Sequence, residues 1–273
     1  MRKKFATIIL NRNLKKETEE LYKKLNKYSK LTDIFILESG SAKKNLSKNY
    51  TWHANWKEAN KKGLRFFRGM NFALSNLYKE NKLNDYNYFL LTSNDAIFQN
   101  KNFYKKIDKI FSTHTKIGIL CGTNKSWINK NFFSKKLSYV WYIQNNAIFL
   151  RKEFILNIMN LNKPGYKNFL FDGTNFRGYG LDTELVAKGY ANYWATAISN
   201  DVIIEENNDY LLNQNDFIKT ETFDKNLKLY KSEGLKWMKN KYGFTSKWSL
   251  VNYSKSFYEI FFKSFPKITK YRV

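Results

Sequence analysis

The stretch YNYFLLTSNDAIF, residues 86–98, begins as an aromatic and aliphatic run and then reaches three polar residues, Ser93, Asn94 and Asp95. The apolar part is typical of a buried strand. Ser, Asn and Asp are common turn residues because their short side chains bond to the nearby backbone. In open α/β sheets, ligands bind at the carboxyl ends of the strands. The stretch therefore predicts a strand that ends either in a plain turn or at a ligand site.

The residues before this stretch predict a β-α-β unit. The run FATIIL at 5–10 is typical of a strand, and leucines near helical spacing predict an amphipathic helix over 14–28. A second strand is expected from Asp33 to Leu37, and it ends at Glu38 and a Ser-Gly-Ser turn. Such a unit implies parallel strands joined by a right-handed crossover.

The rest of the chain continues the alternation of helices and strands. Helices are expected near 70–80, 102–112 and 152–160, and strands at 116–122, within 138–154 and at 191–198. The fold class is therefore α/β, with a mostly parallel central sheet flanked by helices. We expect residues 1–205 to form the catalytic domain and residues 206–273 a helical C-terminal extension.

Composition sets wide limits on function. The chain has 273 residues, of which 43% are hydrophobic, enough for a sizeable core. Its net charge of +25 favours an anionic partner such as nucleic acid, a membrane surface or phosphate. The lysines are scattered among abundant Asn, Ile, Phe and Tyr, the residues that AT-rich codons encode, so we interpret much of the charge as compositional bias. A nucleic-acid-binding protein stays open as an alternative.

Cellular location is inferred from cysteine usage and from the apolar runs. Cys121 is the single cysteine, so the chain forms no intramolecular disulfide, and a reducing cytoplasm is expected. The apolar core of residues 1–13 is too short for a signal peptide and lacks a small-residue cleavage site. No apolar run approaches the roughly 18 residues of a membrane span. We therefore expect membrane contact to be peripheral, at the inner face.

The segment FDGTNFRGYGLDTELVAKGY, residues 171–190, combines glycines with acidic residues. Gly173, Gly178 and Gly180 predict a flexible loop, and LDTELVAKG predicts a helix directly after it. Asp182 and Glu184 open this helix. Acidic side chains there complement the helix dipole, and they are also candidates for catalysis.

Several common motifs are absent. The sequence has no G-x-G-x-x-G after its first strand, no G-x-x-x-x-G-K-[ST], no H-E-x-x-H and no G-x-S-x-G. His53 and His114 are the only histidines. The remaining chemical candidates are carboxylates at strand ends and in loops.

The order of these pieces resembles the GT-A fold glycosyltransferases, and most closely their inverting family two. The resemblance covers about residues 5–200. It is based on Asn11-Arg12 after the first strand, Glu38 after the second, the helix RGMNFAL, the strand that ends in Ser93-Asn94-Asp95, and the segment GYGLDTEL.

The resemblance implies a role for each of these residues. In the family, an acidic residue after the second strand meets the nucleotide, an Asp-X-Asp motif binds a divalent metal and the donor diphosphate, and a later acidic residue is the catalytic base. The implied donor-binding residues are Asn11, Arg12, Glu38, Asn71, Ser93, Asn94 and Asp95, with Asp95 also the metal ligand. Asp182 is the implied base, and Gly178, Tyr179, Gly180 and Glu184 are implied at the acceptor or in a closing loop.

The chain departs from the family at two positions. Ser93 stands where the motif has its first aspartate, which leaves Asp95 as the strong ligand. The family often has a histidine ligand after the later strand, where this chain has Asn200 and Asp201. Metal dependence is therefore less firmly implied than the fold.

The function implied is transfer of a sugar, such as a hexose, from a nucleotide-diphosphate donor to a glycan or lipid-linked glycan, with inversion. Such transfer belongs to the synthesis of cell-surface polysaccharide or lipopolysaccharide. Mn²⁺ or Mg²⁺ is the implied cofactor, because a hard cation stabilises the departing diphosphate. No specific nucleic acid is expected as a partner. The alternative enzyme, a sugar nucleotidyltransferase, usually has a Gly-rich loop after its first strand, and this chain lacks those glycines.

The C-terminal region carries an aromatic stripe. Tyr253, Phe257, Phe261 and Phe265 recur at a spacing of four, among lysines. Such a helix either lies on an anionic membrane near a lipid-linked acceptor or packs on its own domain. We favour the second interpretation.

Overall fold

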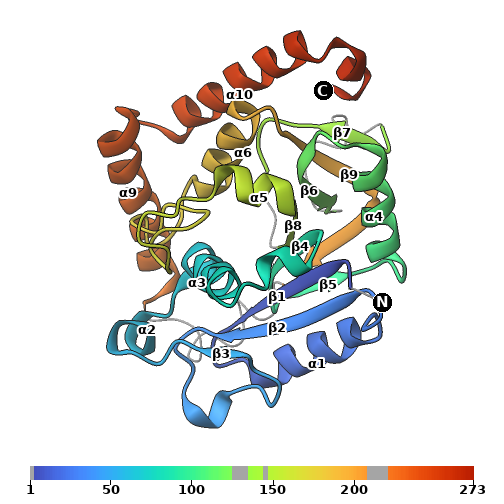
Figure 1. Cartoon of the computed structure of the whole chain (residues 1–273). Coiled ribbons are helices and arrows are strands. Elements are labelled where there is room, and N and C mark those ends of the chain that lie inside the picture. The colour runs from blue at the N-terminus through green and yellow to red at the C-terminus, as the bar shows by residue number, and fades with distance from the viewer. Residues whose placement is uncertain (1–2, 125–134, 144–146, 208–220) are drawn as a thin grey trace.

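The computed structural model describes residues 3–124, 135–143, 147–207 and 221–273 (Figure 1). Within these ranges, nine strands form one sheet. The strands are β1 (Phe5–Asn11), β2 (Thr32–Glu38), β3 (Trp52–His53), β4 (Tyr88–Ser93), β5 (Ala96–Phe98), β6 (Ile117–Thr123), β7 (Leu137–Tyr139), β8 (Ala147–Arg151) and β9 (Ala195–Glu206).

The sheet combines two parallel groups. Its strand order is β3-β2-β1-β4-β8-β6-β9-β5, and β7 pairs with β9. Strands β3, β2, β1 and β4 are parallel, as are β6 and β9, while β8 runs antiparallel between β4 and β6. Because β8 is antiparallel to both neighbours, β1, β2, β4 and β6 all present their carboxyl ends at the same edge.

Helices cover both faces of this sheet. The helices are α1 (Lys15–Asn26), α2 (Lys57–Lys62), α3 (Arg65–Lys79), α4 (Phe103–Thr113), α5 (Lys152–Ile158), α6 (Leu181–Ala191), α9 (Phe223–Tyr242) and α10 (Lys247–Ser264), with short 3₁₀ turns at Lys43–Asn45, Leu83–Asp85 and Pro266–Tyr271. The strand β1 is buried on both faces because α4 lies on one side and α3 on the other. Thr7 bonds to the Tyr104 hydroxyl of α4, and Gly69 of α3 packs against Leu10.

The α/β class, the helices on both faces and the helical C-terminal part are confirmed. Two elements differ from the sequence-based expectation. Helix α3 begins at Arg65 rather than near 70, because the Arg68 guanidinium is buried against the Gly173 carbonyl and the Phe176 ring. Strand β9 continues past Asp201 to Glu206, where it pairs with β5.

The C-terminal helices pack on the α/β part. Ser246 caps α10 by accepting a hydrogen bond from the Ser249 backbone N–H, and α10 lies along α6 (Figure 1). Phe261 is fully buried, whereas Tyr253 is 37% exposed. The Tyr258 hydroxyl is bonded to backbone oxygens of Tyr139 and Val273. Most of the aromatic stripe is therefore part of the core or its border.

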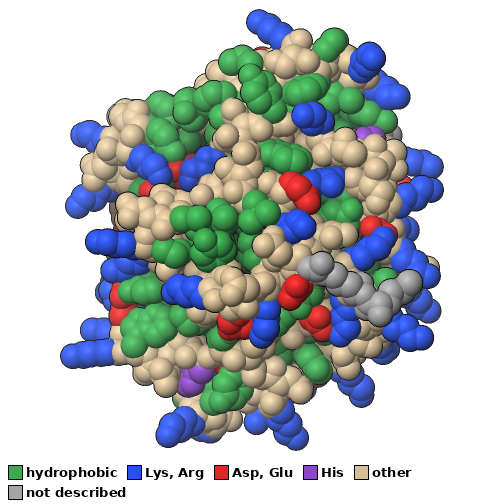
Figure 2. Space-filling view, viewed as in Figure 1, with side chains coloured by type: hydrophobic (Ala, Val, Ile, Leu, Met, Phe, Trp, Pro, Cys, Tyr) green, Lys and Arg blue, Asp and Glu red, His purple; other side chains and the backbone are tan. Residues whose placement is uncertain are grey.

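Two surface properties bear on partners. No helix among the described ranges is both long enough and apolar enough to span a membrane. On the face shown in Figure 2, Lys and Arg side chains are spread around the whole outline of the molecule.

Candidate functional site

Three strand ends meet in a polar network at the carboxyl edge of the sheet. The Asn11 amide at the end of β1 donates to both Glu38 carboxylate oxygens, at 3.0 and 2.9 Å. The Asn94 amide after β4 donates to Asn11 Oδ1 and to Thr18 Oγ1, each at 3.0 Å. The ends of β1, β2 and β4 are thus connected through the side chains of Asn11, Glu38 and Asn94.

Glu38 is fully buried. Its Oε1 also accepts a hydrogen bond from the Ser47 backbone N–H, at 2.7 Å. A buried carboxylate is costly unless it is hydrogen-bonded, and these donors meet that requirement. Glu38 therefore holds the segment after β2 in place, and it lies at the carboxyl edge of the sheet.

Asp95 faces a second carboxylate, that of Glu206. The register pairs Ala96 with Glu206, and the Asn207 backbone N–H donates to the Asp95 carbonyl at 2.8 Å. Partial burial and the neighbouring Asp95 carboxyl, with which it is hydrogen-bonded, raise the pKa of Glu206. The Ser93 hydroxyl donates to Asp95 Oδ1. Two carboxyl groups and a hydroxyl thus gather after β4.

This arrangement fits a divalent cation. Mg²⁺ and Mn²⁺ prefer oxygen ligands, and Mg²⁺ is commonly bound by one or two carboxylates together with water and substrate phosphates. Asp95 and Glu206 supply two such carboxylates. Among the residues that the structure describes, no group of three or more His, Cys, Asp or Glu side chains could hold a metal alone. A cation here would need ligands from water or from a bound diphosphate.

Sequence reasoning missed Glu206. It ended the last strand at Ser199-Asn200-Asp201, where the family often has a histidine ligand, but Asp201 lies in mid-strand and its carbonyl accepts from Lys106 at 2.7 Å. The run VIIEE, residues 202–206, continues the strand pattern and is the signal that could have located Glu206.

Asp182 stands in the first turn of α6, two residues after Gly180. Its Oδ1 accepts hydrogen bonds from the Thr183 backbone N–H, at 2.7 Å, and from the Thr183 hydroxyl, at 3.3 Å. Burial raises the pKa of Asp182, and the positive charge of Lys247 opposes that rise. Burial and the nearby Asp182 also raise the pKa of Tyr230 to about 12. Asp182 is therefore a carboxylate whose proton affinity is increased by its surroundings.

Glu184 has a different setting from Asp182. It is 2% exposed, and its carboxylate is bonded to Lys241 at 2.8 Å, Tyr242 Oη at 2.5 Å and Lys188 at 3.3 Å. Lys241 also reaches Asp172, at 2.6 Å. Glu184 thus connects α6 to α9.

The segment Gly178-Tyr179-Gly180 is closely packed. Gly178 and Gly180 have φ values of 82° and 90°, which L side chains rarely adopt. A Cβ on Gly178 would lie 2.3 Å from the Phe67 ring, and the Tyr179 ring contacts that of Tyr230. Glycine is required here by backbone conformation and by space.

Two of the predicted donor residues bind the protein's own backbone. Arg12 Nη1 donates to the carbonyls of Ser39 and Ala59, at 2.9 and 3.0 Å. Asn71 is fully buried. Its amide donates to Phe171 O at 2.7 Å, and its Oδ1 accepts from the backbone N–H groups of Leu170 and Phe171, each at 2.9 Å.

We expect Asn71→Ala to lower the free energy of unfolding by about 3 kcal/mol or more. The change leaves two buried N–H groups and a carbonyl without partners, and each such loss costs about 1–3 kcal/mol. Urea unfolding measures it. Asn76→Ala, at a partly exposed position of the same helix, is the control and should cost far less. Equal losses of unfolding free energy in both variants would show that the hydrogen bonds of Asn71 do not hold Leu170 and Phe171 in place.

Comparison with known proteins identifies the fold. No protein-family model matches the sequence, and a search of curated proteins finds no match. Solved structures do match. The mannosyltransferase PcManGT from Pyrobaculum calidifontis, solved with GDP-Man and Mn²⁺, aligns at a TM-score of 0.51 with 9% identity, over 95% of this chain and 75% of that one.

Two further structures align equally well. Glucosyl-3-phosphoglycerate synthase from Mycobacterium tuberculosis, solved with Mn²⁺, UDP and phosphoglyceric acid, has a TM-score of 0.51 at 10% identity, over 86% of this chain and 78% of that one. TarS from S. aureus has a TM-score of 0.51 at 13% identity, over 73% of this chain and 36% of that one. The chain has the GT-A fold, as its resemblance to that class implied.

Proposed function

We propose that this protein is a glycosyltransferase that uses a nucleotide-diphosphate sugar. The observation that carries the proposal is the arrangement of carboxylates: Glu38 is the last residue of β2, and Asp95 after β4 meets Glu206 at the end of β9. Asp182 lies near Cys121 of β6, whose pKa is raised by burial and by that carboxylate. Ligands of open α/β sheets bind along this edge.

In this proposal the donor lies across the ends of β1, β2 and β4. Asn94 contacts the nucleoside, and the buried Asn11 and Glu38 hold Asn94 and the turn after β2 in position. Arg12 and Asn71 act through the segments that they hold, since their side chains bind backbone groups. Ser93 orients Asp95 through its hydroxyl.

Asp95 and Glu206 hold the divalent cation. When bound there, Mn²⁺ or Mg²⁺ would stabilise the negative charge that gathers on the departing diphosphate. The Mn²⁺ in the complexes of PcManGT and of glucosyl-3-phosphoglycerate synthase supports this choice of cofactor.

Asp182 is the general base. It takes the proton of the acceptor hydroxyl as the oxygen attacks the anomeric carbon opposite the diphosphate, so the configuration inverts. A raised pKa suits a base that works near neutral pH. The acceptor lies beside the turn at Gly178-Tyr179-Gly180, and Glu184 supports that side through its bonds to α9.

The acceptor class is a glycan or a lipid-linked glycan of cell-surface polysaccharide synthesis. The cytoplasm, with peripheral contact at the inner face of a membrane, is the location where such donors and acceptors meet. Specific nucleic-acid binding is not part of the proposal.

A thermal-shift panel of nucleotide sugars, with and without Mn²⁺, tests the function. A ligand at about 100 times its Kd adds about 2.7 kcal/mol of stability, so the correct donor should raise the Tm measurably, and more so with Mn²⁺. The matching free sugars are the control. A panel in which no nucleotide diphosphate shifts the Tm would contradict the proposal.

A further inference from the structure

A basic pocket lies away from the carboxylates of the proposed donor site. It has a volume of about 680 Å³ and opens between α4, the start of β7, the middle of β9 and the 3₁₀ turn at Pro266–Tyr271. In Figure 1, α4, β7 and β9 lie toward the right of the view, and α2 and α3 lie toward its left. None of the residues assigned above to donor, metal or base lines this pocket.

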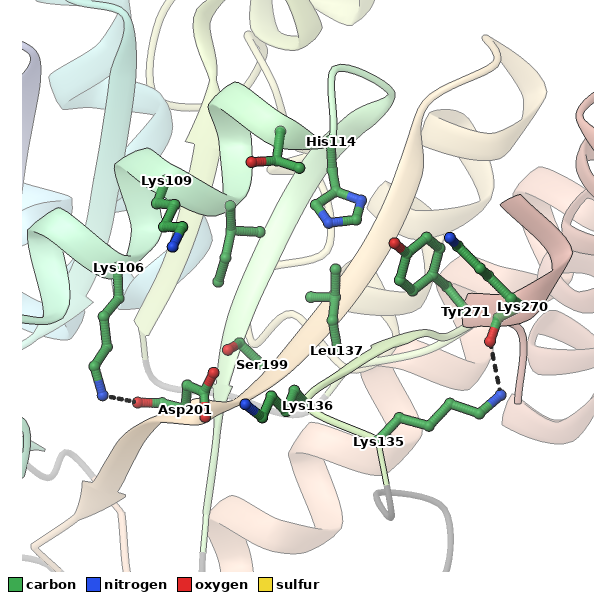
Figure 3. Close-up of a pocket in the computed structure, with 12 residues that line it drawn as sticks. Lys106, Lys109, His114, Lys135, Lys136, Leu137, Ser199, Asp201, Lys270 and Tyr271 are labelled. Carbon is green, nitrogen blue, oxygen red and sulfur yellow. Dashed lines mark hydrogen bonds between the residues drawn. The ribbon is translucent and has the colours of Figure 1, made fainter. Parts of the chain in front are cut away.

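Five lysines line the pocket, and they come from three separate segments: Lys106 and Lys109 from α4, Lys135 and Lys136 from the two positions before β7, and Lys270 from the C-terminal turn (Figure 3). The single acidic residue in the lining is Asp201. Gathering several cations in one concavity is unfavourable without a compensating anion.

Two of these lysines are held by backbone carbonyls. Lys106 donates to Asp201 O at 2.7 Å, and Lys135 donates to Lys270 O at 2.9 Å (Figure 3). Lys109, Lys136 and Lys270 take part in no ion pair among the described residues. The dipole of α4 does not account for this cluster, because the last turn of the helix carries no basic residue.

A buried hydroxyl is the second sign of a ligand. Ser199 lines the pocket, is 1% exposed, and its Oγ has no hydrogen-bond partner among the described residues. Buried polar groups are almost always paired, and an unpaired one calls for an explanation. A hydroxyl in a basic pocket is a donor suited to an anionic oxygen.

The remaining wall is partly apolar. Leu137, Ile110 and the Tyr271 ring line it, and the His114 ring lies edge-on to Tyr271, with centroids 4.8 Å apart. Burial and the nearby Lys270 lower the pKa of His114, which disfavours a positive charge on its ring. The positive charge of the pocket is therefore that of its lysines, and its volume exceeds the needs of a single small ion.

We propose that this pocket binds the phosphate group of a phosphorylated ligand, with Lys109, Lys136 and Lys270 pairing its charge and Ser199 Oγ donating a hydrogen bond. The same chemistry is offered by a soluble phosphate ester and by the headgroup of an anionic lipid. Tyr271 and Leu137 contact the apolar part of the ligand.

Calorimetric titration of pyrophosphate in EDTA tests the site, because EDTA removes the cation that diphosphate binding at Asp95 and Glu206 requires. The double variant Lys109→Gln/Lys270→Gln should bind pyrophosphate about tenfold or more weakly than the parent. The control is Lys23→Gln/Lys24→Gln, which removes the same charge from exposed positions of α1 and should leave the affinity unchanged. Equal affinities of the two double variants would overturn the proposal.

A pair of serine variants tests the hydroxyl. Ser199→Ala should weaken pyrophosphate binding severalfold without lowering the Tm. Ser138→Ala is the control, because Ser138 Oγ is also buried and without a partner but does not line the pocket. A loss of affinity that is the same in both variants would remove Ser199 from the site.

Vesicles distinguish the two sources of phosphate. Vesicles of phosphatidylcholine with phosphatidic acid are compared with phosphatidylcholine alone, for the parent and for Lys109→Gln/Lys270→Gln. If the parent binds pyrophosphate and the lysine variant binds it more weakly, the ligand is a soluble phosphate ester. If the parent binds only the vesicles with phosphatidic acid, and the lysine variant binds them more weakly, the ligand is a lipid headgroup. If the parent binds neither probe, the pocket is not a phosphate site.

Discussion

Asp182→Asn is expected to lower the turnover of sugar transfer by about 10²- to 10⁴-fold, the contribution of a positioned general base. The amide keeps the shape of the side chain and can still accept a hydrogen bond from Thr183. Donor affinity, measured by calorimetry, should therefore stay near that of the parent. Steady-state assays with an identified acceptor measure the turnover.

The same variant should gain stability at neutral pH. Burial raises the pKa of Asp182, so the folded state binds its proton more tightly than the unfolded chain does. The stabilising contribution of the protonated form is complete below the unfolded pKa and is lost as the pH rises through the folded pKa. Removing the ionisable group should thus raise the Tm at pH 7 and have little effect at acid pH.

The exposed Asp201 of β9 offers a matched control for both effects. Asp201→Asn removes the same charge and should change neither turnover nor the pH dependence of the Tm comparably. Full turnover by Asp182→Asn would exclude Asp182 as the base.

Asp95→Ala is expected to reduce the affinity for Mn²⁺ by at least about 100-fold, with donor affinity falling in parallel. The variant removes one of the two carboxylates that meet after β4, and fewer charged oxygen ligands hold a divalent cation more weakly. Glu206→Gln should also weaken Mn²⁺ binding, though less, since an amide oxygen stays in place. Calorimetric titration of Mn²⁺, alone and with nucleoside diphosphate, measures both.

Glu205 provides the control for Glu206. It is the adjacent residue of β9, and its carboxylate accepts a hydrogen bond from Gln99 at 2.7 Å rather than meeting Asp95. Glu205→Gln removes the same charge at nearly the same place and should retain Mn²⁺ binding. If Glu205→Gln and Glu206→Gln weaken Mn²⁺ binding equally, the effect comes from the loss of negative charge in this region, and the assignment of Glu206 as a metal ligand is wrong.

Local patterns were enough to predict β1, α1, β2 and most of β4. The run FATIIL became β1, the leucine pattern that follows became α1, and YNYFLLT became the buried part of β4 before Ser93. Hydrophobic periodicity and turn chemistry act over a few residues, so the chain carries them in consecutive positions. They also indicated the polar strand ends at Asn11 and Glu38.

Contacts between distant segments decided the rest. The helix was expected from about residue 70, but α3 begins at Arg65. Arg68 in its first turns is buried against Gly173 and Phe176, which are about 105 residues further along the chain. Glu206 meets Asp95 only because β9 continues to pair with β5. The basic pocket joins lysines more than 160 residues apart, from Lys106 to Lys270. Such sites depend on tertiary packing, which brings together residues whose local sequences contain no sign of one another.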